Sequence, residues 1–134
     1  MTRAALLQMT TGIDPAANAA TIVDALATAR SEGAAMLFTP EMSGLLDRKR
    51  SRAAETIRTE GEDTVLAAVR EVAAREGLWV HLGSLAIARD DGKWVNRAFV
   101  IDDKGEIRAR YDKLHMFDVD LSTGESWRES SAYA

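Results

Sequence analysis

The beginning of the chain constrains the fold most, because it has the pattern of a strand, a capped helix and a second strand. Residues 3–9 ("RAALLQM") are apolar enough to predict a strand buried on both faces. Asp14 can cap the helix that follows, Pro15 suits its first position, and Gly33 suits the position just after its end. Residues 34–38 ("AAMLF") predict the second strand. This order predicts a right-handed parallel crossover, the unit of α/β folds.

The rest of the chain adds one strong helix and several strands. Residues 62–77 ("EDTVLAAVREVAAREG") predict a helix, and residues 43–61 are predicted to be helical in part. Further strands are predicted at 78–88, with a break or bulge near Gly83, at 93–101 and at 106–111. Turns that contain Gly92 and Gly105 favour antiparallel hairpins. We therefore expect a mixed sheet with helices on one face, followed by a loop-like tail after Tyr111.

The composition argues against several classes of protein. The 134 residues suit one domain or part of one, and 46% hydrophobic with 28% charged residues is a globular balance. A net charge of −4 with one short basic cluster gives no reason to expect nucleic acid as a partner. No apolar run approaches the roughly 20 residues that span a bilayer, so we expect no membrane partner and a cytoplasmic protein. Cysteine is absent and histidine is scarce, which argues against disulfides and a metal site.

Several polar positions are candidates for chemistry. Glu41 directly follows a predicted buried strand, and Lys113 follows the last predicted strand. Ligand sites in open α/β sheets cluster at the carboxyl ends of strands. A partly buried glutamate there can act as a base, and a lysine can stabilise an oxyanion. Glu125 or Glu129 in "GESWRES" could reach such a lysine. The alternative is a set of solvated charges, with Glu41 as a helix cap and Lys113 paired with Asp112.

Three segments resemble motifs of the carbon–nitrogen hydrolases of the nitrilase superfamily. "MLFTPEMS" is similar to the strand and catalytic glutamate of that family, which implies this role for Glu41. "RYDKLHMFDVD" is close to the family's lysine motif and implies that Lys113 is the catalytic lysine. "GESWRES" resembles the segment with a second constant glutamate and matches Glu129 better than Glu125. The "HMFDVD" segment is most similar to the amidase branch that includes ω-amidase and deaminated-glutathione amidase.

The resemblance implies a fold, a reaction and partners. The fold would be an α/β structure, an α-β-β-α sandwich with a mixed sheet, of which residues 1–134 form an incomplete N-terminal portion of a single domain. The reaction would be hydrolysis of small amides through a thioester, in which Lys113 stabilises the oxyanion, Glu41 moves the proton and Glu129 positions the lysine or the substrate. Residues 114–117 would help to exclude water. No cofactor or metal is implied. A homodimer or higher oligomer is expected, because family members pair and an incomplete sandwich leaves apolar surface open.

The nucleophile of the family is a cysteine, which this chain lacks. We interpret the absence as truncation ahead of the nucleophile, and a natural cysteine-free relative is the other interpretation. The chain alone is therefore expected to be inactive by the family mechanism. The alternative function is a non-catalytic binding or assembly module on the same fold. The retained Glu41, Lys113 and Glu129 favour an enzyme as the parent protein.

Overall fold

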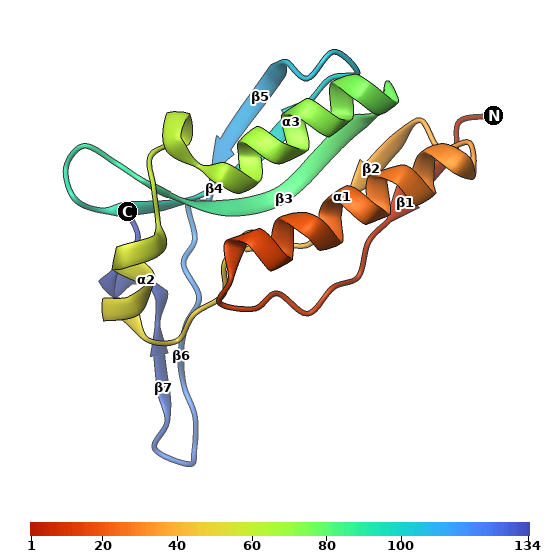
Figure 1. The fold of residues 1–134 in the computed structure, drawn as a ribbon. Helices are drawn as coiled ribbons and strands as arrows, with labels where there is room; N and C mark the ends of the chain where they lie inside the picture. Colours follow the sequence, from red (N-terminus) through yellow and green to blue (C-terminus); the bar gives the residue numbers. More distant parts are fainter.

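The computed structural model describes the backbone of residues 1–134 and every side chain except that of Trp127. Figure 1 shows the arrangement of its helices and strands. The elements in chain order are β1 (Ala4–Leu6), α1 (Pro15–Ser31), β2 (Met36–Phe38), α2 (Arg50–Thr56), the 3₁₀ turn η1 (Glu60–Glu62), α3 (Thr64–Glu76), β3 (Trp79–Ala88), β4 (Trp94–Ile101), β5 (Ile107–Asp112), β6 (Asp118–Asp120), β7 (Ser126–Arg128) and a second 3₁₀ turn η2 (Glu129–Ser131).

The main sheet is mixed and has the strand order β1-β2-β3-β4-β5. The first three strands are parallel, and β4 and β5 continue the sheet as antiparallel hairpins. Helices α1 and α3 lie side by side along one face of this sheet (Figure 1). The predicted parallel crossover, the two hairpins and the mixed α/β architecture are thus confirmed, although β1 and β2 are shorter than the apolar runs that predicted them.

Both long helices begin at aspartate caps. The Asp14 carboxylate accepts a hydrogen bond from the backbone N–H of Ala16 at 3.0 Å, and Asp63 accepts one from Leu66 at 2.7 Å. These bonds satisfy backbone donors that have no partner within the first turn of a helix. Helix α3 ends at Gly77, whose φ of 64° lies in the left-handed region that suits glycine.

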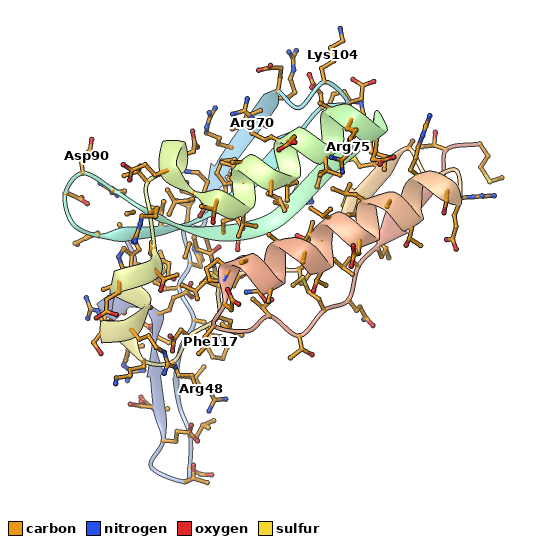
Figure 2. The ribbon with its side chains drawn as sticks, viewed as in Figure 1. Arg48, Arg70, Arg75, Asp90, Lys104 and Phe117 are labelled. Atoms are coloured by element: carbon orange, nitrogen blue, oxygen red, sulfur yellow. The ribbon has the colours of Figure 1, made fainter. Side chains whose placement is uncertain are left out.

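The hydrophobic core lies between the two helices and the sheet. Ile22 and Leu26 of α1 and Val69 of α3 are fully buried against Leu82 of β3 and Phe99 of β4. Burying a side chain of this size contributes about 1.5–3 kcal/mol. At the far end of the layer, Arg70 of α3 donates a hydrogen bond to the carbonyl of Gly105 at 2.7 Å, which ties the helix to the β4–β5 turn (Figure 2).

The face of the sheet opposite α1 and α3 is partly open. Leu6, Phe38 and His81 are register partners on β1, β2 and β3, so their side chains share this face. Leu6 is 79% exposed, which contradicts the prediction that residues 3–9 are buried on both faces. The reason is that β1 is an edge strand whose only strand neighbour is β2, with helices on one side of the sheet.

The tail after Tyr111 is more regular than predicted. Strands β6 and β7 form a small antiparallel hairpin that projects from the main body, beside α2 (Figure 1). Each strand has three residues, too few for an alternating pattern to be recognised in the sequence. Their connection turns at Gly124, which has a φ of 84°. Among the helices of the described residues, none combines the length and apolar character needed to cross a membrane.

Candidate active site

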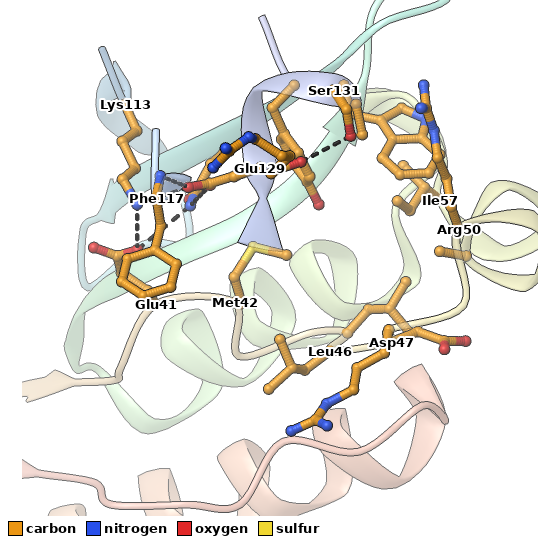
Figure 3. A pocket seen from close by; sticks show the side chains of 18 of the residues that line it. Glu41, Met42, Leu46, Asp47, Arg50, Ile57, Lys113, Phe117, Glu129 and Ser131 are labelled. Atoms are coloured by element: carbon orange, nitrogen blue, oxygen red, sulfur yellow. Dashed lines mark hydrogen bonds and ion pairs between the residues drawn. The ribbon is translucent and has the colours of Figure 1, made fainter. Parts of the chain in front are cut away.

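A pocket of about 900 Å³ lies at the end of the sheet where β2 leads into the following loop. It is enclosed by that loop, α2, β4, the end of β5 and the tail. Its apolar lining comes from Leu45, Leu46, Ile57, Trp94, Phe117 and Tyr133. Figure 3 shows Glu41, Lys113 and Glu129 gathered at one side of the pocket and Arg50 at the other. An apolar cavity with a few converging polar groups is the usual form of a small-molecule site.

Glu41 is presented by a strained turn. The backbone N–H of Met42 donates to Ser84 Oγ at 2.8 Å, and that of Ser43 donates to the Ser84 carbonyl at 3.0 Å. Met42 has a φ of 52°, a left-handed conformation that costs a residue with a side chain roughly 1–2 kcal/mol. Strain of this kind persists only where the surroundings impose it. The hydrogen bonds to Ser84 of β3 therefore hold the turn in this conformation, and the turn places Glu41 at the pocket.

The turn rests against a bulge in β3 at Gly83, where a break was predicted. The register with β4 shifts between Leu82 and Leu85, and a Cβ on Gly83 would lie 2.4 Å from the carbonyl oxygen of Thr39. Two further backbone atoms, both of Pro40, would lie within 2.5 Å of it. Only glycine allows the turn that carries Glu41 to approach the sheet this closely.

Gly83→Ala is expected to lower the free energy of unfolding by about 3 kcal/mol, because the backbone of Thr39 and Pro40 must move to admit the methyl group. Gly61→Ala is the matched control. A Cβ on Gly61 meets nothing within 4 Å and its φ is not positive, so its effect should stay within about 0.5 kcal/mol. Urea denaturation followed by circular dichroism measures both. Equal unfolding midpoints for the two variants would show that the close approach at Gly83 is not required.

Lys113 lies between two glutamates that are distant in sequence. Its ammonium nitrogen is 3.4 Å from Glu41 Oε2 and 3.2 Å from Glu129 Oε2 (Figure 3). The three residues that the family resemblance assigned to one site therefore lie together. Burial would lower the pKa of Lys113, but the hydrogen bonds and charges of Glu129 and Glu41 outweigh burial and raise it. The lysine is therefore held in its charged form.

Glu129 is the more enclosed of the two carboxylates, with a side chain 15% exposed. It accepts hydrogen bonds from the backbone N–H of Phe117, from Asn96 Nδ2 at 3.2 Å and from Lys113. Burial would raise the pKa of Glu129, but these donors outweigh burial and hold the pKa below its ordinary value. Glu129 is thus kept ionised beside the lysine.

An ion network secures the end of β5 behind Lys113. Arg97 Nε donates to Asp112 Oδ1 at 2.6 Å, and Arg97 Nη2 donates to Asp112 Oδ2 at 2.9 Å. Glu60 accepts from Arg110 at 2.7 Å and lies 3.4 Å from Arg97. The hydrogen bond from Arg97 lowers the pKa of Asp112, so the pair is fully charged at neutral pH. Asp112 is therefore engaged with Arg97, which removes the alternative that it is the partner of Lys113.

The structure differs from the sequence-based expectations at two points of the site. Glu41 is 60% exposed rather than partly buried. Leu114 and Phe117 are themselves exposed rather than covered, although Phe117 lines the pocket together with Lys113. Glu125 lines the pocket, but its carboxylate is not one of those paired with Lys113. Among described side chains, no group of three or more histidine, cysteine, aspartate or glutamate residues could hold a metal ion.

Asn96 was missed by the sequence analysis. It is buried in β4, and its side-chain amide donates toward both Glu41 and Glu129. A signal for it was present, because "WVNRAFVI" places an amide in a strand that is otherwise apolar except for Arg97. A buried polar group needs partners, and those partners are frequently functional.

Comparison with known proteins identifies the family. The model of the family described as carbon-nitrogen hydrolase matches residues 3–133. The chain belongs to the carbon-nitrogen hydrolase family. It is 33% identical over 132 residues to the deaminated glutathione amidase of Yersinia enterocolitica, covering 96% of this chain and 46% of that protein. It is 37% identical over 113 residues to the nitrilase and fragile histidine triad fusion protein NitFhit of Drosophila melanogaster, covering 84% of this chain and 24% of that protein.

The fold is that of carbon-nitrogen hydrolase amidases. The structure matches an amidase from Nesterenkonia sp. AN1 with a TM-score of 0.81 and 27% sequence identity, covering 100% of this chain and 49% of that chain. That amidase structure shows the result of acrylamide addition at an active-site cysteine. The chain thus spans about half the length of the Yersinia and Nesterenkonia relatives, and each of these matches covers nearly all of this chain. The chain contains no cysteine.

Proposed function

We propose that residues 1–134 are part of a single carbon-nitrogen hydrolase domain and supply the Glu41, Lys113 and Glu129 portion of an amide-hydrolysing site. The observation that carries this proposal is the convergence of the three charged side chains at one pocket, with Lys113 within 3.4 Å of both carboxylates. A scaffold would have no need of a charged lysine held between two carboxylates beside a cavity. The proposed substrate is a small amide, and the family and the amidases among its relatives support that class.

The proposed reaction uses a thiol that these residues do not contain. Glu41 accepts the thiol proton as the sulfur attacks the amide carbon, and the carbonyl electron pair moves to the oxygen. The oxyanion lies against the Lys113 ammonium, which stabilises it without having to reorganise. The intermediate then collapses, the C–N bond breaks, and the proton on Glu41 passes to the departing ammonia. Water hydrolyses the resulting thioester by the same proton path, which releases the acid and restores the thiol.

Glu129 has a positioning role in this scheme. It accepts from the Phe117 backbone and from Lys113, so it links the tail to the lysine. Its negative charge keeps Lys113 protonated when a neutral amide replaces water in the pocket. Glu41, which is more exposed and lies on the strained turn, is the better placed of the two to exchange a proton with a thiol supplied by residues outside this chain.

The experiment is an ammonia-release assay on butyramide, a ligand found in a structure of the Nesterenkonia amidase. It compares the 134-residue chain with a chimera that adds the part of that amidase carrying its active-site cysteine. The chimera should release ammonia, and the chain alone should not exceed the rate of buffer. The same chimera with its cysteine replaced by alanine is the matched control. Turnover by the chain alone at the rate of the chimera would place the nucleophile within these residues and overturn the scheme.

A second function has support from two observations. The absence of cysteine and the exposure of Glu41 also suit a non-catalytic module that binds small amides without cleaving them. A folded chimera that binds butyramide but releases no ammonia would favour this alternative.

A further inference from the structure

The side chain of Asn96 uses both of its amide hydrogens within the site. Asn96 is 2% exposed and lies on β4, with its side chain directed to the pocket that it lines. Its Nδ2 is 3.4 Å from Glu41 Oε2 and 3.2 Å from Glu129 Oε1. A primary amide has two N–H donors, so one asparagine can serve both carboxylates at once. Glu41 and Glu129 come from segments 88 positions apart in sequence and share this single neutral donor.

The backbone of the same residue holds Lys113. The Asn96 carbonyl accepts a hydrogen bond from the backbone N–H of Lys113 at 2.9 Å, one residue beyond the end of β5. The Lys113 ammonium then contacts Glu41 Oε2 and Glu129 Oε2. Asn96 and Lys113 therefore bridge the same two carboxylates, one through a neutral amide and the other through a charge. A single position in β4 contacts every member of the charged cluster.

The residue type suits this position. Two carboxylates beside one ammonium leave a net negative charge, so the second carboxylate favours protonation or rotation into solvent. Glu41 is the freer to rotate, because it is 60% exposed. An aspartate at position 96 would add a third negative charge in a buried place, and a leucine of similar size would offer no donor. An uncharged double donor stabilises both anions and leaves the charge of Lys113 available to a substrate.

We propose that Asn96 is a positioning residue that holds the Glu41 carboxylate toward Lys113 and Glu129 and so keeps the cluster assembled before substrate binds. The expected effect of Asn96 on turnover rests on the proposed function, whereas its expected effect on the carboxylates of the cluster does not. The two can be tested separately, because carboxylate titration requires no reaction.

The test is a ¹³C NMR titration of the Glu side-chain carboxyls in the 134-residue chain between roughly pH 2 and pH 8. Asn96→Leu is expected to raise the titration midpoint of Glu129 by about half a unit to one unit, because a donor to its ionised form is lost. In the chimera, the variant is expected to lower kcat about tenfold with little change in KM.

Asn18→Leu is the matched control. Asn18 is another buried asparagine, and it bonds only to the backbone of Gly12 and Gly44 among its described partners. This variant should lose stability without moving the midpoint of Glu129. If Asn96→Leu does not fold, Asn96→Ser replaces it and should raise the midpoint of Glu129 by a smaller amount. A folded variant at position 96 whose Glu129 titrates as in the unmodified chain would overturn the inference, whatever the result of the activity assay.

Discussion

Replacing Lys113 by methionine in the chimera is expected to lower kcat for small amides about a thousandfold. Methionine keeps most of the length of the side chain but removes the charge that lies within 3.4 Å of both glutamates. Loss of one donor to a developing oxyanion costs roughly 100- to 1,000-fold in kcat. The loss here is at the upper end, because Glu41 and Glu129 would also be left facing each other without a cation. Their repulsion would disturb the proton path.

The matched control for this prediction is Lys104→Met. Lys104 lies in the β4–β5 turn at the far end of the molecule from the pocket and is exposed (Figure 2). Its replacement should leave kcat and KM unchanged. Steady-state kinetics of ammonia release measures both variants, and circular dichroism verifies that each is folded. A Lys113→Met chimera whose kcat stays within tenfold of the parent would show that the lysine does not stabilise the transition state.

The second large effect is expected in self-association of the chain. Leu6, Trp79 and Tyr111 are exposed apolar side chains on strands of the main sheet, and Leu6 shares the open face with Phe38 and His81. Exposed apolar surface of this kind drives association, and β1 adds an unpaired strand edge. We propose that two or more copies pair through this face. Size-exclusion chromatography with light scattering should give a mass of at least twice that of one chain.

A double variant tests where the copies meet. Leu6→Lys with Tyr111→Lys places two positive charges on exposed strand positions and should shift the population to monomer while leaving the fold intact, since both side chains are exposed. Leu121→Lys is the control, because Leu121 is an exposed apolar residue on the separate β6–β7 hairpin. A sharp monomer peak for the unmodified chain at high concentration would contradict the proposal. Equal masses for the double variant and its parent would place the contact elsewhere.

Local signals in the sequence were enough to predict most of the layer that carries the site. The Asp14 cap and the glycines at 92 and 105 act through backbone geometry within a few residues, so they can be interpreted without knowledge of distant contacts. The charged motif around Lys113 was recognisable because a strongly hydrated side chain sits beside an apolar run. The exposure of the side chains in that run was not predictable, because whether Leu114 and Phe117 are covered depends on what packs against them.

The contacts that were missed depend on long-range geometry. Asn96 acquires its role from two glutamates that are 55 and 33 residues away in sequence. The burial of β1 was overestimated, because apolar composition indicates that a strand can be buried but not that a second layer is present. The β6–β7 hairpin is held by three pairs of residues and by the ion pair between Arg128 and Asp120, none of which produces a periodic pattern.

The most direct test of the account is the position of a bound amide. A crystal structure of the chimera with butyramide, with the cysteine replaced by alanine to prevent turnover, would show it. We predict that the amide oxygen lies within hydrogen-bond distance of the Lys113 ammonium and that the carbonyl carbon faces the Glu41 carboxylate, inside the pocket lined by Asn96 and Glu129. Butyramide bound away from Lys113 and Glu41, with these two side chains still paired as they are in the free chain, would contradict the central claim.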